Sequence, residues 1–203
     1  MAASGPVSTY RSGAEPSLPE KVVAIHRQLD AAKVPHAIGG ALALAYYAEP
    51  RATVDIDVNV FVATDRWPQV RETLAPLGVD VALDLAVLER DGQVRLWWGR
   101  NPVDLFFSND PFHEEMRRHV RRVPFGQATL SILSPEHLAI CKAMFDRPKD
   151  WLDIEQMLVA TDPIDLTEIE LLLERMVGAD DPRIGKLGEI KARLSLDDQA
   201  NPA

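Results

Sequence analysis

Two aspartates, Asp55 and Asp57, stand two residues apart in the segment RATVDIDVNVFV, residues 51–62. Apolar and polar residues alternate along this segment, which is the pattern of a β-strand with one apolar face. Side chains at positions i and i+2 of a strand project from the same face, so the two carboxylates face the same way. Asp is among the residues that strands accept least readily. A pair of them on one face therefore points to chemistry.

Paired carboxylates are ligands that hard divalent cations prefer. The Cβ atoms at positions i and i+2 of a strand lie about 6–7 Å apart, which lets the carboxylates hold one cation between them or share two. Mg²⁺ or Mn²⁺ suits oxygen ligands of this kind, together with water and substrate phosphate. The Asp-x-Asp pattern is short, and the solvated face of an edge strand also accounts for it.

A glycine turn precedes the acidic segment. Gly39 and Gly40 follow the apolar segment 34–38 and open residues 41–49, which are rich in helix formers and are stopped by Pro50. Backbone without side chains can approach a phosphate closely, and the amides at the start of a helix can bind it. The order of glycine turn, helix and acidic strand therefore favours a site for nucleotide phosphate over a simple turn.

The segment IGGALALAYYAEPRATVDIDVNVFV, residues 38–62, resembles the signature of the DNA polymerase beta nucleotidyltransferase superfamily. That signature consists of a Gly-Gly or Gly-Ser turn, a helix, and then Asp-hydrophobic-Asp. The form Arg-x-Thr/Ser-x-Asp-Ile-Asp is similar to the AbiEii-type nucleotidyltransferase toxins of bacterial toxin-antitoxin systems. The likeness is specific over residues 36–62 and extends to about residue 158.

The resemblance implies a third carboxylate on a later strand. We expect Asp104 in NPVDLFF, residues 101–107, because its apolar neighbours would bury that strand, where an acid without a cation is costly. Asp80 and Asp84 are alternatives, and a turn after Pro102 would also accommodate Asp104. The expected metal ligands, all of them carboxylates with Mg²⁺ or Mn²⁺ as the cofactor, are Asp55, Asp57 and Asp104.

The resemblance also implies a lysine on a helix behind Ser-Pro-Glu-x-Leu. The segment 134–158 supplies Lys142, expected to pair with nucleotide phosphate; a snorkelling surface lysine is the alternative. Asp153 or Asp150 would position it, and Asp150 would equally cap a helix. The candidate catalytic residues are Asp55, Asp57, Asp104 and Lys142. The candidate nucleotide-binding residues are Gly39, Gly40, Arg51, Thr53, Lys142 and Asp153.

The flanking residues have two interpretations each. Arg51 would brace the site or cap the preceding helix, whereas Thr53 would contact phosphate or metal-bound water. Trp97 and Trp98 would stack on a base, although one of two adjacent strand residues normally packs in the core.

The only basic cluster in the sequence would bind an RNA acceptor or form a solvated junction balanced by neighbouring acids; its members are Arg117, Arg118, His119, Arg121 and Arg122. The five histidines show no metal-ligand spacing, so we do not expect zinc.

The order of elements predicts an α/β (α+β) fold with a nucleotidyltransferase-like mixed sheet flanked by helices and a C-terminal helical portion. Residues 80–98 are expected to form strands, and residues 66–78 a helix with Thr64 or Asp65 as its N-cap. The expected divisions are a disordered tail 1–18, a nucleotidyltransferase core 19–133, a helical portion 134–196 and a second tail 197–203.

Composition limits where the protein acts. The 203 residues include 22 basic and 31 acidic ones, and the formal charge of −9 will not draw the whole chain to nucleic acid or anionic lipid. A polyanionic substrate then needs a local basic patch or a metal. A single cysteine excludes an internal disulfide framework and favours the cytoplasm. The sequence contains no apolar run of membrane-spanning length and no secretory signal.

These features predict a metal-dependent nucleotidyltransferase of the EC 2.7.7 type. It would move a nucleoside monophosphate from an NTP to an acceptor hydroxyl. The resemblance implies the 3′ end of tRNA or another RNA as acceptor, a role as the toxin of a toxin-antitoxin pair, and a cognate antitoxin as partner. The alternatives are a small-molecule or protein acceptor, and a non-catalytic member that binds nucleotide or a partner.

Overall fold

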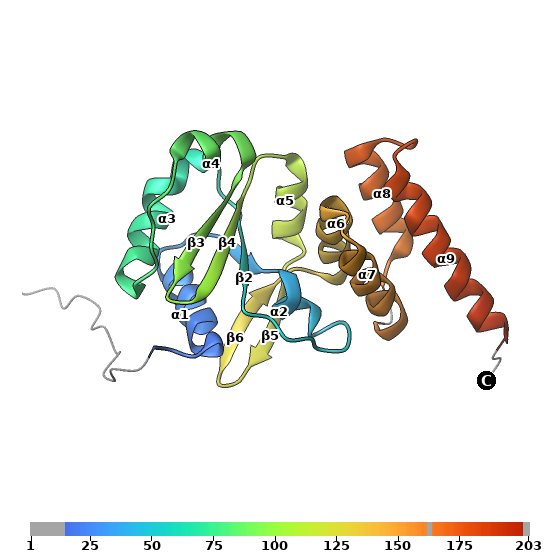
Figure 1. Ribbon diagram of the computed structural model, residues 1–203, viewed down its shortest axis with the longest axis horizontal. Helices are drawn as coiled ribbons and strands as arrows, with labels where there is room; N and C mark the ends of the chain where they lie inside the picture. The colour runs from blue at the N-terminus through green and yellow to red at the C-terminus, as the bar shows by residue number, and fades with distance from the viewer. Residues whose placement is uncertain (1–14, 162–163, 201–203) are drawn as a thin grey trace, which may run out of the picture.

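A six-stranded mixed sheet forms the framework of the molecule (Figure 1). The computed structural model describes residues 15–161 and 164–200, without the side chains of 195–200. The strands are β1 (His36–Ile38), β2 (Ile56–Val60), β3 (Gln93–Trp98), β4 (Asn101–Phe107), β5 (Arg121–Phe125) and β6 (Ala128–Ile132). They lie side by side in the order β3-β4-β2-β1-β6-β5. The pairs β2–β4 and β1–β6 are parallel, and the other pairs are antiparallel.

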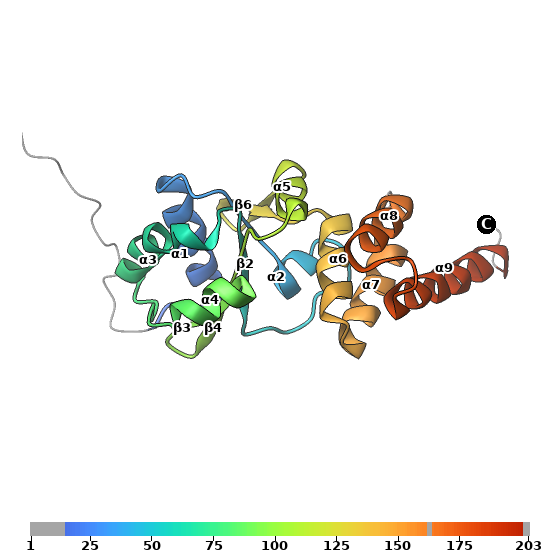
Figure 2. The ribbon, with the colours of Figure 1, turned by 90° about the horizontal axis from the view of Figure 1, so that it is seen from above.

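Two sets of helices accompany the sheet. The helices and 3-10 turns that alternate with the strands are α1 (Leu18–Ala31), α2 (Gly40–Leu44), η1 (Thr64–Arg66), α3 (Trp67–Leu74), η2 (Ala75–Leu77), α4 (Leu85–Asp91) and α5 (Pro111–Arg118). The C-terminal helices are α6 (Pro135–Phe145), α7 (Pro148–Ala160), α8 (Leu166–Val177) and α9 (Pro182–Ala200). In both ribbon views α6 and α7 lie between the sheet and the pair α8 and α9 (Figure 2). The predicted mixed α/β fold with a C-terminal helical portion is confirmed.

The two faces of β2, β4 and β3 differ in character. One face supplies the core, with side chains that are completely buried at Ile56, Val58, Val103, Leu105 and Leu96. On the other face Asp57 is paired in register with Asp104, which is in turn paired with Arg95. Because alternate residues of a strand share a face, a charged row crosses three neighbouring strands on the side away from the core.

The glycine turn lies directly against this charged row. The Gly39 amide donates a hydrogen bond of 2.9 Å to the carbonyl oxygen of Asp57. Gly40 has a φ of +55°, and a Cβ added to it would lie 1.9 Å from Oδ2 of Asp57. The position therefore requires glycine twice over, for its backbone angle and for the space that the carboxylate occupies.

Three local predictions were wrong. Residues 85–91 form helix α4 where we expected a strand; Asp84 caps it by accepting a hydrogen bond from the Ala86 amide. Periodicity could not separate the two because a short apolar run suits a buried strand and a helix alike. Thr64 and Asp65 belong to the 3-10 turn, and the N-cap of α3 is Arg66. The predicted helix 41–49 is shortened to α2, which ends at Leu44.

The chain ends differ partly from the predicted tails. Helix α1 begins at Leu18 behind a Ser17/Glu20 capping box, and the earlier residues 1–14 lie outside the described range. Helix α9 continues to Ala200, so the predicted boundary after residue 196 falls inside it. The division at residue 133 stays a prediction. Within residues 15–161 and 164–200, no helix is long and apolar enough to cross a membrane.

Replacing Gly40 by alanine should destabilise the protein by about 2–4 kcal/mol, because the new Cβ would meet Asp57 and the backbone would be strained. Urea unfolding measures this change. Gly185→Ala is the matched control, because a Cβ there meets no atom within 4 Å. It should stabilise helix α9 by about 0.5–1 kcal/mol. Equal unfolding free energies for Gly40→Ala and wild type would disprove the close approach of Asp57 to the turn.

Candidate active site

Three predicted carboxylates lie near one another at the charged row. Asp57 is partly buried, and burial followed by the charges of Asp104 and Asp55 raises its pKa to about 6. These effects act together because both a less polar environment and a nearby like charge disfavour ionisation. The register of β2 and β4 places Asp57 beside Asp104, and Asp55, directly before β2, acts on the same carboxyl through its charge.

Thr53 shapes the backbone in front of Asp55. Its hydroxyl oxygen accepts a hydrogen bond of 3.2 Å from the Asp55 amide and also lies 3.4 Å from the Asp55 carbonyl oxygen. Such local bonds from threonine hydroxyls stabilise turns. Thr53 thus fixes the entry into β2, while its predicted contact with phosphate or metal-bound water stays a prediction.

Arg95 holds the third carboxylate. Its Nε and Nη2 atoms donate to the two oxygens of Asp104 at 2.8 and 2.7 Å. The Arg95 side chain is 55% exposed, whereas that of Asp104 is 14% exposed. We did not identify Arg95 from the sequence. The available signal was the alternation of Gln93, Arg95 and Trp97, which places three polar or amphipathic side chains on one face of a strand.

The carboxylates of the charged row are of the type that the predicted metal prefers. Within the described part of the chain, no three His, Cys, Asp or Glu side chains are arranged as a group that could hold a metal ion. The chemistry of the carboxylates still fits Mg²⁺, since all donors are hard oxygens and the charge on Asp57 is unfavourable where it stands. At Asp104 a guanidinium supplies the opposing charge. A cation that bound both Asp104 oxygens would have to displace Arg95.

A buried ion-pair cluster lies on the helical side of the site. Nζ of Lys142 on α6 lies 2.6 Å from Oδ2 of Asp153 on α7, and both side chains are almost completely buried. Arg51 also donates to Asp153, at 3.1 and 3.3 Å. Burial raises the pKa of Asp153, but hydrogen bonds from Arg51 and Lys142 outweigh it and hold the pKa below its usual value. Asp153 therefore positions both cations.

Asp150, the alternative partner for Lys142, pairs with Arg147 instead, at 2.5 and 3.1 Å. The charges of Lys142 and Arg147 both lower the pKa of Asp57, against the effect of burial. The cations of α6 and of the α6–α7 turn thus face the acidic strand. Phe145 at the end of α6 packs edge-on against Phe106 of β4, with ring centroids 5.9 Å apart. These contacts make the C-terminal helices one wall of the site.

The other acids considered lie elsewhere in the hydrogen-bond network. Asp80 accepts from the Ala82 amide at 3.1 Å, and Asp84 caps α4. Asp104, by contrast, is paired in register with Asp57 and raises its pKa. Of the three candidates for the third carboxylate, Asp104 is the one that the structure brings beside Asp57.

The basic cluster between α5 and β5 does not act as one patch. Arg117 and Arg118 both pair with Glu114. Arg121 lies over the ring of Tyr47, 5.7 Å from its centroid, and His119 stacks on His137 with centroids 5.2 Å apart. These side chains point to separate partners, so the arrangement favours the solvated-junction interpretation over an RNA grip.

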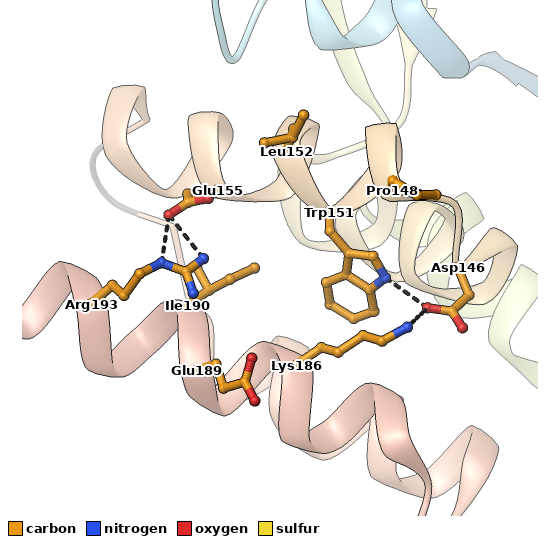
Figure 3. Close-up of a pocket in the computed structure, with 9 residues that line it drawn as sticks. All are labelled: Asp146, Pro148, Trp151, Leu152, Glu155, Lys186, Glu189, Ile190 and Arg193. Atoms are coloured by element: carbon orange, nitrogen blue, oxygen red, sulfur yellow. Dashed lines mark hydrogen bonds and ion pairs between the residues drawn. The ribbon is translucent and has the colours of Figure 1, made fainter.

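A pocket of about 330 Å³ lies between α7 and α9 (Figure 3). Lys186 reaches from α9 to Asp146 at 2.5 Å and lies over the Trp151 ring, and Trp151 donates to the same carboxylate. Arg193 closes the other end by pairing with Glu155. None of the predicted catalytic or nucleotide-binding residues lines this pocket. It is a feature of helix packing within the C-terminal portion and is separate from the carboxylate site.

Solved structures of nucleotidyltransferases and of a nucleotidyltransferase-like protein share this fold. The antibiotic-resistance factor ANT(2'')-Ia aligns over 90% of this chain and 97% of its own, with a TM-score of 0.57 and 15% identity. The lincosamide antibiotic adenylyltransferase LnuA, bound to lincomycin, aligns over 70% and 96%, with a TM-score of 0.52 and 13% identity. An antigenic nucleotidyltransferase-like protein from Paracoccidioides brasiliensis aligns over 84% and 92%, with a TM-score of 0.50 and 17% identity. The chain has the fold of the polymerase beta-like nucleotidyltransferases.

A match to a family model identifies which family of nucleotidyltransferases the chain belongs to. The model for the nucleotidyl transferase AbiEii toxin of type IV toxin-antitoxin systems matches residues 37–201. The protein therefore belongs to the AbiEii family of nucleotidyltransferases, and the predicted family and enzyme class are confirmed. The match continues past residue 158, where the resemblance seen in the sequence ended. No sequence among the curated proteins matches the chain.

Replacing Asp57 by asparagine should stabilise the metal-free protein at high pH. The folded-state pKa of about 6 exceeds the ordinary value of 3.8. The charge therefore destabilises the fold above about pH 6, and this cost disappears as the pH falls toward 4. We expect Asp57→Asn to raise the unfolding free energy by about 1–2 kcal/mol at pH 8 and to leave it nearly unchanged at pH 4.

Urea unfolding in EDTA at pH 8 and pH 4 measures the effect of Asp57→Asn. Asp65→Asn, at an exposed aspartate of η1, is the matched control and should show no such difference. A destabilisation by Asp57→Asn at both pH values would contradict the proposed cost of the Asp57 charge.

Replacing Asp153 by alanine should destabilise the fold by about 3–5 kcal/mol, because Lys142 would keep a buried charge without its partner. Lys142→Met leaves Asp153 paired with Arg51 and should cost less. Thermal unfolding in high and low salt compares the two variants. The order of the two effects would be reversed if Lys142 rather than Asp153 held the cluster together.

Proposed function

We propose that this AbiEii-family enzyme transfers a nucleoside monophosphate from an NTP to a hydroxyl of an RNA acceptor and acts as the toxin of a toxin-antitoxin pair in the cytoplasm. The family resemblance implies the 3′ end of tRNA as that acceptor. The observation that carries the proposal is the pairing in register of Asp57 with Asp104 on parallel strands, with Asp55 beside them and a glycine turn against them.

The carboxylates are the proposed ligands of Mg²⁺ or Mn²⁺. Asp55 and Asp57 would hold the ions beside the triphosphate, and Asp104 would complete the ligand set on the acceptor side. Bound divalent cations of this kind offset phosphate charge and make an acceptor hydroxyl more acidic. The raised pKa of Asp57 supports this assignment, because a buried carboxylate among other carboxylates is favourable once a cation stands between them.

The opposite side of the site would bind the nucleotide. Gly39 and Gly40 let the backbone of the turn lie directly against Asp57, so that backbone amides would bind phosphate beside the metal ligands. Lys142 and Arg51 are oriented by Asp153 and would offset negative charge on the β- and γ-phosphates. A preformed cluster of this kind costs little reorganisation when the substrate binds.

The proposed reaction is an in-line displacement. The oxygen of the acceptor hydroxyl forms a bond to the α-phosphorus, and the bond from the α-phosphorus to the bridging oxygen of the pyrophosphate breaks. Pyrophosphate leaves with the electron pair of the broken bond. The proton of the hydroxyl passes through the Asp104 carboxylate to water. No redox step is needed.

Incubation with each of the four radiolabelled NTPs, Mg²⁺ and total RNA tests the proposal. Wild type should label RNA, and Asp57→Asn and Asp57→Ala should lose at least about 100-fold in rate. EDTA should abolish labelling, and excess Mg²⁺ should restore it. Asp65→Asn should behave like wild type.

Parallel reactions with total protein and with a set of small hydroxyl compounds separate the alternative acceptors. Labelling of either in place of RNA would overturn the RNA acceptor but keep the chemistry. Equal labelling of RNA by wild type and Asp57→Ala would overturn the catalytic role of the carboxylates.

A further inference from the structure

We propose that Arg95 and Trp97 of the edge strand β3 form the surface that binds the acceptor RNA. In this assignment Trp97 stacks on a base near the acceptor end, and Arg95 exchanges the Asp104 carboxylate for a phosphate of the acceptor strand when the metal binds. The inference deepens the proposed function and rests on it.

The sheet order separates a nucleotide side from an acceptor side. The glycine turn stands on the β1 side of Asp57, where the triphosphate is proposed to bind. Asp104 stands on the other side of Asp57, and β3 is the next strand beyond it. An acceptor that attacks in line approaches opposite to the leaving pyrophosphate. In this arrangement the acceptor comes in over β4 and β3.

Trp97 is displayed on this approach. Its side chain is 47% exposed, while that of the adjacent Trp98 is 5% exposed and packs in the core. Two partners fix the strand at this residue: Pro102 in β4 and the Asp80 amide, which donates to the Trp97 carbonyl at 2.7 Å. Within the described part of the chain, the Trp97 ring makes no ring contact or side-chain hydrogen bond. A fixed, open indole face is a suitable stacking surface for a base.

Arg95 lies two residues from Trp97 and projects from the same face of β3. Arg95 now binds both Asp104 oxygens, so a metal ion on the acceptor side would compete with it for this carboxylate. Loss of this partner would free a guanidinium that is already 55% exposed. The guanidinium of an arginine presents two parallel N–H donors that match two oxygens of a phosphate. The freed guanidinium of Arg95 would therefore bind a phosphate of the acceptor backbone beside the stacked base.

An exposed tryptophan ring beside an arginine on one face of β3 favours single-stranded RNA over a protein or small-molecule acceptor. A nucleic acid strand repeats a flat base and a phosphate at short spacing, and an aromatic ring with an adjacent cation recognises that repeat. The chain as a whole is acidic, with a formal charge of −9, so it needs a local cation of this kind at the point of RNA contact.

Binding of a fluorescein-labelled 12-nucleotide RNA with a free 3′ hydroxyl, measured by anisotropy in Mg²⁺ without NTP, tests the role of Trp97. Trp97→Ala should weaken binding at least about 10-fold, and Trp97→Phe should restore most of it. Trp151→Phe, which removes a tryptophan from the pocket between α7 and α9, is the matched control and should bind like wild type.

A separate experiment tests whether Arg95 exchanges the Asp104 carboxylate for a phosphate of the RNA. Mn²⁺ binding followed by electron paramagnetic resonance without RNA should become tighter in Arg95→Ala, because the competing guanidinium is gone. The same variant should bind the RNA at least about 5-fold more weakly in Mg²⁺. Arg90→Ala, which removes an exposed arginine paired with Asp91, should change neither value.

Failure of this inference is distinguishable from failure of the proposed function. RNA labelling and RNA binding that are unchanged in Trp97→Ala would overturn the acceptor surface and leave the nucleotidyl transfer intact. Weaker Mn²⁺ binding in Arg95→Ala would overturn the exchange. Labelling of protein or small molecules only, without RNA binding, would overturn both the RNA acceptor and this surface. RNA binding lost in Trp97→Ala without any labelling would support the surface while the proposed transfer failed.

Discussion

The repulsion between like charges at the centre of the sheet is the constraint on which the site depends. Asp57 is partly buried, and the charges of Asp104 and Asp55 act on it together with burial. A hydrophobic core on the opposite face of the same strands fixes the positions of these carboxylates. They cannot move apart without loss of that core, so the repulsion must be offset by cations. The surrounding structure provides these cations from two directions.

The cations differ in how firmly they are held. Lys142 is almost completely buried and is bound to Asp153. Burial shields this ion pair from water and salt, so its geometry is firmly held. Arg95 is largely exposed on the edge strand β3 and is bound to Asp104 of the adjacent strand β4. One side of the site is therefore fixed and the other adjustable. This asymmetry agrees with the proposed function, in which the nucleotide has a constant shape and the acceptor is part of a larger molecule.

The sequence was sufficient for the mixed α/β fold, because alternation on the acidic strand and the capped C-terminal helices are strong local signals. The family resemblance implied a third carboxylate, and the apolar neighbours of Asp104 favoured it over Asp80 and Asp84, since an acid within an apolar strand needs a counter-charge. The helix α4 was missed, because the apolar run ahead of Asp91 fits a strand as well as a helix. Arg95 was missed although β3 and β4 are consecutive strands, because its role depends on the register that pairs it with Asp104. That register is set by the geometry of the turn between the two strands and not by the alternation of residue types alone. Likewise, the choice between Asp150 and Asp153 required the packing of α6 against α7.

The contact between Gly40 and Asp57 has a consequence for sorting related sequences. A side chain at position 40 and a carboxylate at position 57 exclude each other in this backbone, since they would occupy the same space. A relative that has gained a larger residue in the turn has either rebuilt the turn or lost the acid. Superfamily members that carry the Gly-Ser form of the turn must therefore place either the turn or the aspartate differently from this chain.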